Sequence, residues 1–436
     1  MKIYRAYQAE LDPNDVQRTA FLRAAGTARW AYNWGLRKKI DAIEARKAAL
    51  ATGVPKEQAP KVPSAIDLHK ELNTLKLVPK DQGGVPWMYE SSKTAPQEAL
   101  RNLDKAFQSF YAKCKSKTKG PKGFPRFKSR KNGIGGFRLE TPTVIFKTIR
   151  LPRIGQVRLK ERGYLPESEN PTVRALGVSV KERAGRWFAS VSVEQEIPDT
   201  IVDIMKPIIG VDVGIKNLAV CSDGQVFENP KALASKAKKL VRLQRSVSRR
   251  VKGSSNRRKA KARVAKCHYR IGNVRKDAIH KASDSITKNA SVIVIEDLNV
   301  AGMTKNHKLA KAICDASFSE LHRQIVYKAA WRGVQVLVAD RFYPSSKMCS
   351  SCDNVKKDLT LSEREYICES CGVIEDRDLN AAKNLAQLAV SSTVTACGDF
   401  SSGTDRKVDA KLGSLKQEPN GKRDGCGGFT AIPHFA

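Results

Sequence analysis

Apolar and polar residues alternate in three stretches of the N-terminal half, and alternation with a period of two is typical of a strand with one buried face. These stretches are residues 1–11, 144–160 and 173–197, and Gly and Pro residues punctuate the last two. We therefore expect antiparallel strands that form a small β-barrel, whose first strand comes from residues 2–10.

A helical pattern separates the first of these strands from the others. Apolar residues recur at helical spacing from Asp15 to about Lys119, with a Gly- and Pro-containing loop at residues 51–63. Thr94 and Gln97 have the spacing of a capping box before a second long helix. The sequence thus predicts a helical block inserted after the first strand of the barrel.

The pattern changes at Pro207, where short apolar strands begin to alternate with helices. The order β-β-β-α-β-α-β is typical of an RNase H-like (RuvC-like) fold, and a final helix after residue 376 closes it. The predicted strands are residues 208–214, 218–221, 225–227, 291–296 and 333–339, and the helix between the last two is residues 317–331.

Three carboxylates in this predicted fold lie at strand ends or at a helix start, where they are candidate metal ligands. Asp212 and Glu296 end apolar strands, where a buried, unpaired carboxylate is costly, and Asp378 lies in the first turn of the closing helix. Together they could hold two Mg²⁺ ions, or Mn²⁺, and hydrolyse a phosphodiester. Taken singly, the same residues could be a turn acid, a helix-cap acid and a surface charge.

Four cysteines form two C-x2-C pairs with fifteen residues between them, which is the ligand spacing of a zinc ribbon. They are Cys349, Cys352, Cys368 and Cys371. The sequence predicts one structural Zn²⁺ here. The other six cysteines are scattered, which fits a reducing compartment.

The composition adds a large positive charge. Lys and Arg number 79 against 44 acids, which gives a formal charge of +35, so we expect a polyanionic partner and first of all nucleic acid. No apolar stretch has the length of a membrane span or the form of an export signal. We expect a cytoplasmic, nucleoid-associated protein.

Two basic stretches are candidate nucleic-acid contacts. Residues 231–281 hold nineteen Lys or Arg and one acid, in two helices joined by a turn at residues 253–256. Residues 113–131 hold nine Lys or Arg with phenylalanines between them, which indicates either a solvated linker or a phosphate-binding strip whose rings stack on bases. The candidate residues are Phe124, Arg126, Phe127, Lys128, Arg257, Arg258, Lys259 and Lys261.

The sequence resembles the TnpB family, the transposon-encoded relatives of type V CRISPR effectors, over nearly its whole length. The matching segments are WAYN at 30–33, GFPRFKSR at 123–130, LPRIGQVRL at 151–159, GVDVGIKNLAV at 210–220, VIEDLNV at 294–300, FYPSSKMCSSC at 342–352, YICESCG at 366–372 and DRDLNAAKN at 376–384. One departure is Asp353, which follows the first cysteine pair where Gly is usual; Asp tolerates the left-handed conformation moderately well.

The resemblance implies a function and a division of labour along the chain. Such proteins take a guide RNA from the transposon end, bind double-stranded DNA beside a short transposon-adjacent motif, and cut both strands in one nuclease site. The resemblance assigns that site to Asp212, Glu296 and Asp378, and a rough alignment assigns motif reading to Lys93 and Gln97. We expect a monomer with one RNA.

The implied domains follow from the same resemblance. They are a wedge-type β-barrel (1–10 and 120–200), a helical recognition lobe (11–119), a RuvC-like nuclease (206–343 and 374–393, with a basic hairpin at 231–290), a zinc ribbon (344–373) and a disordered tail (394–436). Two alternatives remain open, an RNase H-like transposase or recombinase without an RNA guide and a non-catalytic nucleic-acid-binding regulator.

Overall fold

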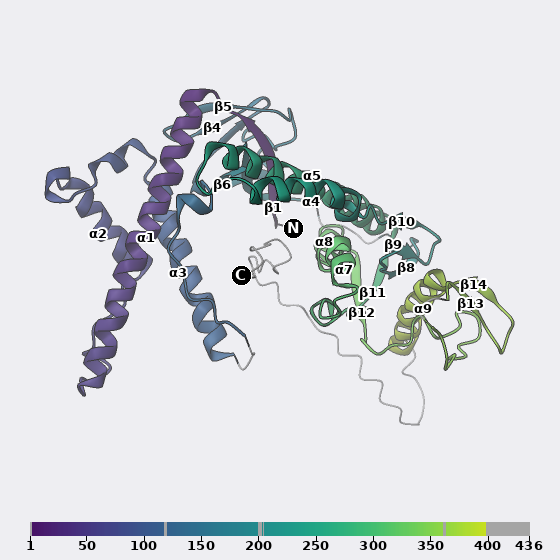
Figure 1. The fold of residues 1–436 in the computed structure, drawn as a ribbon. Coiled ribbons are helices and arrows are strands. Elements are labelled where there is room, and N and C mark those ends of the chain that lie inside the picture. The colour runs from purple at the N-terminus through teal and green to yellow at the C-terminus, as the bar shows by residue number, and fades with distance from the viewer. Residues whose placement is uncertain (1, 117–119, 199–202, 204, 361–362, 398–436) are drawn as a thin grey trace. The chain divides into compact units, whose positions relative to one another are not determined.

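The chain divides between Asp199 and Thr200 into two units (Figure 1). The computed structural model describes residues 2–116, 120–198, 203, 205–360 and 363–397. The two units have separate hydrophobic cores and are described in turn.

In its described residues, the first unit combines a long antiparallel sheet with three α-helices and three short 3-10 helices. Its elements are β1 (Lys2–Asp12), α1 (Asp15–Ala51), α2 (Ala65–Leu77), the 3-10 helices η1 (Lys80–Gln82) and η2 (Pro86–Glu90), α3 (Thr94–Lys115), the 3-10 helix η3 (Arg130–Asn132), β2 (Gly136–Leu139), β3 (Thr143–Ile145), β4 (Thr148–Leu151), β5 (Gly155–Leu159), β6 (Val173–Arg183) and β7 (Arg186–Glu196).

Strand β1 lies at the centre of the seven-stranded sheet, whose order is β2-β6-β7-β1-β5-β4-β3. It pairs with β7 from Lys2 opposite Glu196 to Leu11 opposite Trp187, and with β5 at its far end. The predicted strand at residues 2–10 is therefore confirmed, as is the insertion of helices after it. Among the described residues no pairing joins the edge strands β2 and β3, so closure into a barrel stays a prediction.

Helix α1 begins where the sequence provides a cap. The Asn14 side chain accepts from the Gln17 N–H at 2.8 Å, and the Gln17 side chain accepts from the Asn14 N–H at 3.2 Å. The helix buries Phe21 and Leu36 in a core that it shares with α3 and the sheet. This core holds the helical block on the sheet.

The predicted capping box at the start of α3 is wrong. Thr94 is itself buried in the first helical turn, and the N-cap is Lys93, whose side chain makes no capping bond. The Thr94 hydroxyl lies 3.1 Å from that of Ser92 in a buried polar cluster, so it is not placed to cap the helix. Gln97 therefore has no capping role.

The second unit is a five-stranded mixed sheet with helices and a small motif that contains four cysteines. Its elements are β8 (Ile208–Asp212), β9 (Asn217–Cys221), β10 (Val226–Glu228), α4 (Ala232–Ser248), α5 (Ser255–Asn289), β11 (Val292–Glu296), α6 (Val300–Met303), α7 (Ala310–Ala316), α8 (Phe318–Trp331), β12 (Gln335–Ala339), β13 (Glu365–Ile367), β14 (Ile374–Asp376) and α9 (Arg377–Cys397).

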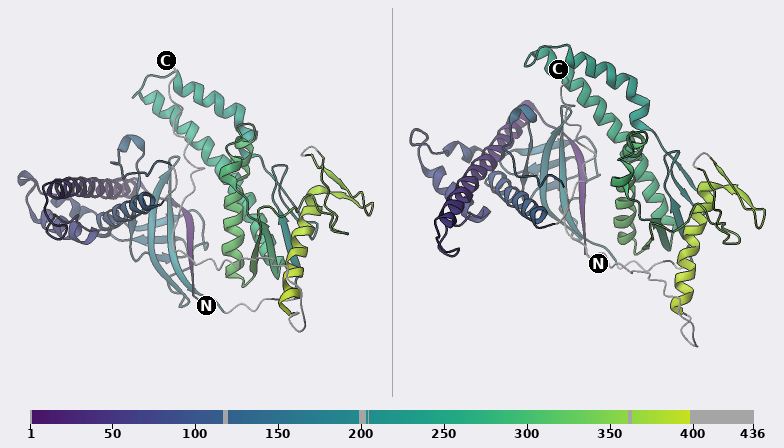
Figure 2. Two further views of the ribbon diagram at one scale, coloured as in Figure 1. Left: turned by 90° about the horizontal axis from the view of Figure 1, so that it is seen from below. Right: turned by 60° about the horizontal axis from the view of Figure 1, so that its bottom comes forward.

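The sheet has the order β10-β9-β8-β11-β12, in which β8, β11 and β12 are parallel and β9 and β10 antiparallel. Successive residues of a strand face opposite sides of a sheet. Ile293 and Ile295 accordingly pack with α5 and α8, whereas Val294 packs with α9. Figure 2 shows these helices on the two sides of the sheet. The predicted apolar strands β8 and β11 are thus buried on both faces.

The last helix of the second unit extends beyond the predicted end of the nuclease at residue 393. Helix α9 continues to Cys397, so residues 394–397 are helical and the expected tail does not begin at 394. The rest of that tail lies outside the described residues. No helix in the described ranges has the length and apolar character needed to cross a membrane.

Candidate functional site

Asp212 and Glu296 lie side by side at one edge of the five-stranded sheet. Strands β8 and β11 are parallel neighbours, and their register places Val211 opposite Ile295. The next residue of each strand is the acid, so both carboxylates leave the sheet at the same level. Parallel pairing is what brings them together, since the strands are far apart in sequence.

Helix α9 brings the third acid to this edge. It crosses β8 so closely that a Cβ on Gly210 would lie 2.0 Å from the Ala382 carbonyl oxygen and 2.6 Å from the Ala386 nitrogen. Only glycine permits this approach. Asp378 lies one turn before Ala382, and its negative charge contributes to the raised pKa of the Asp212 carboxyl.

The electrostatics of Asp212 reflect this crowding. Burial raises its pKa to about 8, with further contributions from the negative charges of Glu296 and Asp378, while Arg377 acts in the opposite direction. Three carboxylates at one edge repel one another, and a cation or a proton relieves that repulsion.

Asp376 and Asp378 have different tasks. One oxygen of Asp376 accepts the N–H groups of Asp378 and Leu379, at 2.9 and 3.2 Å, and so caps α9. Asp378 stands inside the first turn, where its carboxylate remains half-buried. Asp376 is therefore engaged as the helix cap, whereas Asp378 is the acid that the resemblance assigns to the site.

Ser345 is a residue of this site that the sequence reasoning missed. Its side chain is 3% exposed, and its hydroxyl donates to a Glu296 oxygen at 2.5 Å. It therefore fixes one oxygen of the Glu296 carboxylate. In the sequence, the signal for this residue is the Ser345-Ser346 pair just before the first cysteine.

The four cysteines converge as their spacing predicts. Their sulfurs all lie within 4.8 Å of one another, with Cys349 and Cys371 at 3.6 Å and Cys352 and Cys368 at 3.5 Å. Four ligands 2.3 Å from a tetrahedral Zn²⁺ would lie about 3.8 Å apart. Sulfur type, number and spacing all fit a structural metal. In the part of the chain that the structure describes, this is the single metal-type cluster.

The two cysteine knuckles have the same backbone geometry. The Asp353 N–H donates to the Cys349 carbonyl, and the Gly372 N–H donates to the Cys368 carbonyl, both at 3.0 Å. Asp353 and Gly372 both adopt positive φ, 58° and 75°. The expectation that Asp353 tolerates the left-handed conformation is confirmed. The Cys371 N–H also helps to lower the pKa of Cys368 to about 6.

Two buried asparagines of α9 attach the first knuckle to the acid site. Asn380 donates to the Met348 carbonyl at 2.7 Å and accepts the Ser350 N–H at 2.9 Å. Asn384 donates to the carbonyls of Ser345 and Met348, at 2.7 and 2.6 Å. The helix that carries Asp378 therefore also holds the start of the cysteine motif and the Glu296 partner Ser345.

The predicted basic hairpin is formed by α4 and α5, which pack along each other (Figure 1). Arg258, Lys259 and Lys261 are exposed. Arg257 is half-buried and donates to the Arg250 carbonyl at 2.6 Å, so it closes the turn. The structure thus separates one turn-forming residue from three surface cations.

The base of this hairpin is fixed by buried Asp315 of α7. Its carboxylate accepts the N–H groups of Leu233 and Ala234, at 2.9 to 3.2 Å, and the Arg275 guanidinium at 2.8 Å. It therefore caps α4 and pairs with α5, which orients both basic helices on the sheet. The sequence offered no sign of this role, because the partners are distant along the chain.

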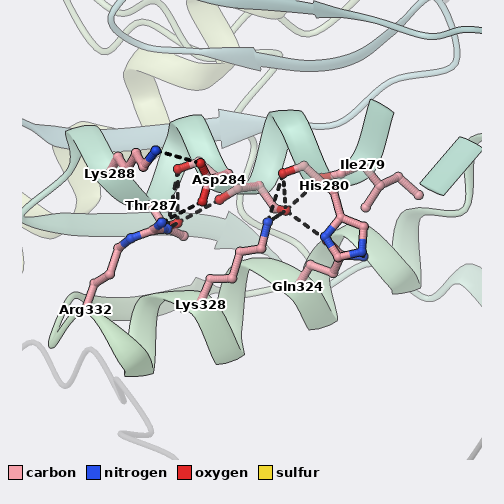
Figure 3. Close-up of polar contacts among 9 residues, drawn as sticks. Ile279, His280, Asp284, Thr287, Lys288, Gln324, Lys328 and Arg332 are labelled. Atoms are coloured by element: carbon pink, nitrogen blue, oxygen red, sulfur yellow. Dashed lines mark hydrogen bonds and ion pairs between the residues drawn. The ribbon is translucent and has the colours of Figure 1, made fainter. Parts of the chain in front are cut away.

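A second polar seam joins α5 to α8 (Figure 3). Lys328, 8% exposed, donates to the His280 carbonyl and the Ser283 hydroxyl, each at 2.8 Å, and burial lowers its pKa. Arg332 pairs with Asp284 at 2.6 Å. Directional bonds of this kind fix the long basic helix in one register on the fold.

The predicted strip at residues 113–131 lies in the first unit, and its described part after residue 119 is anchored at two points. Asn33 exchanges two hydrogen bonds with the Lys128 backbone, at 2.8 and 2.9 Å, and the Lys128 ammonium lies 3.6 Å from the centre of the Tyr32 ring. Phe124 packs edge-on against α3 while 42% exposed, and Phe127 is 47% exposed. Both rings keep surface on which a base could stack.

The remaining predicted contacts also lie in the first unit. Lys93 is exposed at the start of α3, Gln97 is half-buried one turn later, and Arg126 is exposed. The structure therefore brings the three acids and the ribbon together in the second unit, while the predicted motif readers and the strip belong to the first.

Comparison with known proteins gives matches along the chain. The model of the OrfB_IS605 family, described as "Probable transposase", matches residues 190–307. The models described as "Cas12f1-like, TNB domain" and "Helix-turn-helix domain" match residues 318–385 and 1–48. In this structure the last range holds one strand and one long helix, β1 and α1.

Relatives of similar length match nearly the whole chain. A "Putative RNA-guided DNA endonuclease" of Streptomyces pristinaespiralis is 34% identical over 96% of this chain and 97% of its own. The "Putative RNA-guided DNA endonuclease InsQ" of Escherichia coli (strain K12) is 30% identical over 96% and 98%. Among solved structures, a chain of a Cas12f1–sgRNA–target DNA complex covers 88% of this chain and 99% of its own, at 16% identity and a TM-score of 0.47.

Proposed function

Because the chain belongs to the OrfB_IS605 (TnpB) family, we propose that it is an RNA-guided DNA endonuclease that cuts double-stranded DNA beside a short transposon-adjacent motif. The observation that supports the assignment of chemistry is that Asp212 and Glu296 follow paired residues of two parallel strands, and that the charge of Asp378 acts on the Asp212 carboxyl. A guide-free transposase would use similar acids, but relatives named as RNA-guided endonucleases favour the guided reaction.

The sheet of the second unit supports a RuvC-like nuclease. Three antiparallel strands followed by two parallel ones, with β8 central, is the order of an RNase H-like fold. The nuclease then comprises β8 to β12 and α9, and the cysteine motif is inserted between β12 and α9. In the first unit, the sheet corresponds to the wedge-type barrel and α1 to α3 to the recognition lobe.

The three acids are oxygen ligands of the type that Mg²⁺ or Mn²⁺ prefers, and two such ions would supply an activated water and stabilise the leaving oxygen. Asp212 and Glu296 project from a rigid sheet, and Ser345 orients Glu296. Asp376 caps the helix so that Asp378 points from a fixed turn. These supports position the ligands before the nucleic acid arrives.

The four cysteines would hold one Zn²⁺ with a structural role. A bound metal would join the two knuckles, and Asn380 and Asn384 fix the first knuckle to α9. The ribbon thereby steadies the segment that carries Ser345. Loss of zinc should disturb the acid site through that connection.

The guide RNA is the best candidate for the partner that binds the basic hairpin. Helices α4 and α5 present nearly unbroken positive charge, which attracts phosphates whatever their sequence. Base pairing by the guide then supplies sequence specificity, and the protein itself reads shape and the adjacent motif. Lys93 and Gln97 are the proposed motif readers, while Phe124, Arg126, Phe127 and Lys128 would follow the backbone and stack on bases.

The experiment that tests this proposal is co-purification. Protein expressed with its transposon end should carry one discrete RNA, and Asp212→Ala should keep that RNA and the DNA target while losing cleavage. Protein that purifies without RNA and cuts transposon ends directly would support the transposase alternative instead.

A further inference from the structure

Three of the chain's five tryptophans gather on α1 and η2 of the first unit. Trp30 lies nearly parallel to Trp34, with ring centres 6.0 Å apart, and meets Trp87 edge to face at 5.9 Å. All three are half-buried, so part of this aromatic surface faces solvent. Neither the acid site nor the basic hairpin explains the cluster.

Beside this cluster lies a cavity of about 410 Å³ that is open to solvent. It is lined by Arg23, Gly26, Thr27, Arg29, Trp30, Asn33 and Trp87. Gly26 lies within α1, where glycine costs about 1 kcal/mol of helix stability relative to alanine. A Cβ there would meet no atom nearer than 3.9 Å, so backbone packing does not require glycine, and its small size leaves the cavity open.

Positive charge borders the aromatic wall. Arg23 and Arg29 line both this cavity and an adjoining one of about 270 Å³, to which Arg130 also contributes. None of the described residues that line these two cavities is acidic. Arg23 also pairs at 2.8 Å with Glu90, but both side chains are about half exposed, so a phosphate can compete.

We propose that the cavity floored by Gly26 holds one unpaired nucleobase of the nucleic-acid partner, with the neighbouring phosphate against Arg23 and Arg29. A flat ring can pack on Trp30 and Trp87, and stacking of a base on an aromatic side chain contributes about 1–3 kcal/mol. A phosphate between two guanidinium groups accepts charge-assisted hydrogen bonds. Few other ligands combine an aromatic ring with an adjacent anion.

The site should tolerate different bases. Asn33 is the one side-chain amide in the lining, and its oxygen and nitrogen already bond the Lys128 backbone at 2.8 and 2.9 Å. Thr27 likewise directs its hydroxyl to the Arg23 carbonyl and the Ser91 hydroxyl, both at 3.1 Å. The ring faces therefore provide the binding, and a base inside a duplex could not reach them.

This inference rests on the proposed function, since it needs a nucleic-acid partner, and tryptophan fluorescence tests it. Short oligouridylate and oligothymidylate would be titrated in parallel into wild-type protein, Gly26→Ala and Gly26→Leu. Wild type and Gly26→Ala should be quenched alike, because the added Cβ has room. Gly26→Leu fills the cavity and should bind about tenfold more weakly, which corresponds to the loss of one stacked base.

The two arms identify the source of the base. Stronger quenching by oligouridylate assigns the cavity to RNA, and stronger quenching by oligothymidylate assigns it to DNA. Quenching of Gly26→Leu equal to that of Gly26→Ala would overturn the proposal. A second variant, Trp30→Phe, keeps a ring for stacking and should lose the part of the quenching that comes from Trp30 while retaining affinity; undiminished quenching in it would also overturn the assignment.

Failure of this inference is distinguishable from failure of the proposed function. Wild-type protein that carries RNA and cuts its target, with no effect of Gly26→Leu on quenching, rejects the base-binding cavity alone. Wild-type protein that neither binds RNA nor cuts rejects the function and the cavity together.

Discussion

Substituting Gly210 by alanine should displace Asp378 while leaving its carboxylate unchanged. The new Cβ would lie 2.0 Å from the Ala382 carbonyl oxygen, whereas ordinary contacts of this kind are at least 3.4 Å, so α9 must retreat by more than 1 Å. Overpacking of this kind costs about 1–3 kcal/mol of unfolding free energy. A displacement of about 1 Å at a catalytic group can cost about 100-fold in rate.

The assay is single-turnover cleavage of a matched DNA target, with RNA binding and thermal unfolding measured on the same preparations. Gly210→Ala should cut about 100-fold more slowly and unfold earlier, yet keep its RNA, because the basic hairpin does not contact Gly210. Gly272→Ala in α5 is the matched control, since a Cβ there meets no atom within 4 Å. Cleavage by Gly210→Ala at the wild-type rate would refute the claim that close packing of α9 positions Asp378.

Three further predictions test other parts of the molecule. Elemental analysis should find one zinc per chain, and Cys352→Ser should lower both zinc content and the unfolding temperature; zinc-free native protein would contradict the ribbon. Replacing the three exposed hairpin cations Arg258, Lys259 and Lys261 by Gln should make RNA affinity less salt-dependent, with a slope change of about 2–3 in log K against log salt. An unchanged slope would exclude contacts of these residues with RNA. The hydrogen bond from Arg332 lowers the pKa of Asp284 to about 2 from 3.8, so the stabilisation that this pair contributes is present above pH 4 and is lost as pH falls toward 2. Asp284→Asn should therefore be less stable at neutral pH and show a shallower acid transition. An acid-unfolding profile identical to that of wild type would rule out the effect.

The strand pattern and the cysteine spacing could be predicted because both are local signals. Alternation identified β1, β6 and β7, and apolar runs identified β8 and β11 with their terminal acids. The C-x2-C spacing likewise needs no knowledge of distant residues, because each knuckle is a short turn. These features follow from the chain itself.

The supporting contacts could not be predicted in the same way. Ser345 on Glu296, and Asp315 on the start of α4, are side chains whose partners lie 49 and about 80 residues away. The capping box at Thr94 was wrong because tertiary burial determined where α3 begins. In the sequence Arg257 is equivalent to its basic neighbours, but in the structure its guanidinium donates to the Arg250 carbonyl.

Reprogrammed cleavage tests the central claim most directly. Protein carrying its RNA would be assayed with two plasmids after the guide segment has been exchanged for a second sequence. The account predicts that both strands are cut in whichever plasmid matches the guide, with Mg²⁺ or Mn²⁺ required, and that Asp212→Ala binds the same plasmid without cutting. Cutting that ignores the exchanged guide, or that persists in Asp212→Ala, would contradict an RNA-guided nuclease with its active site at these three acids.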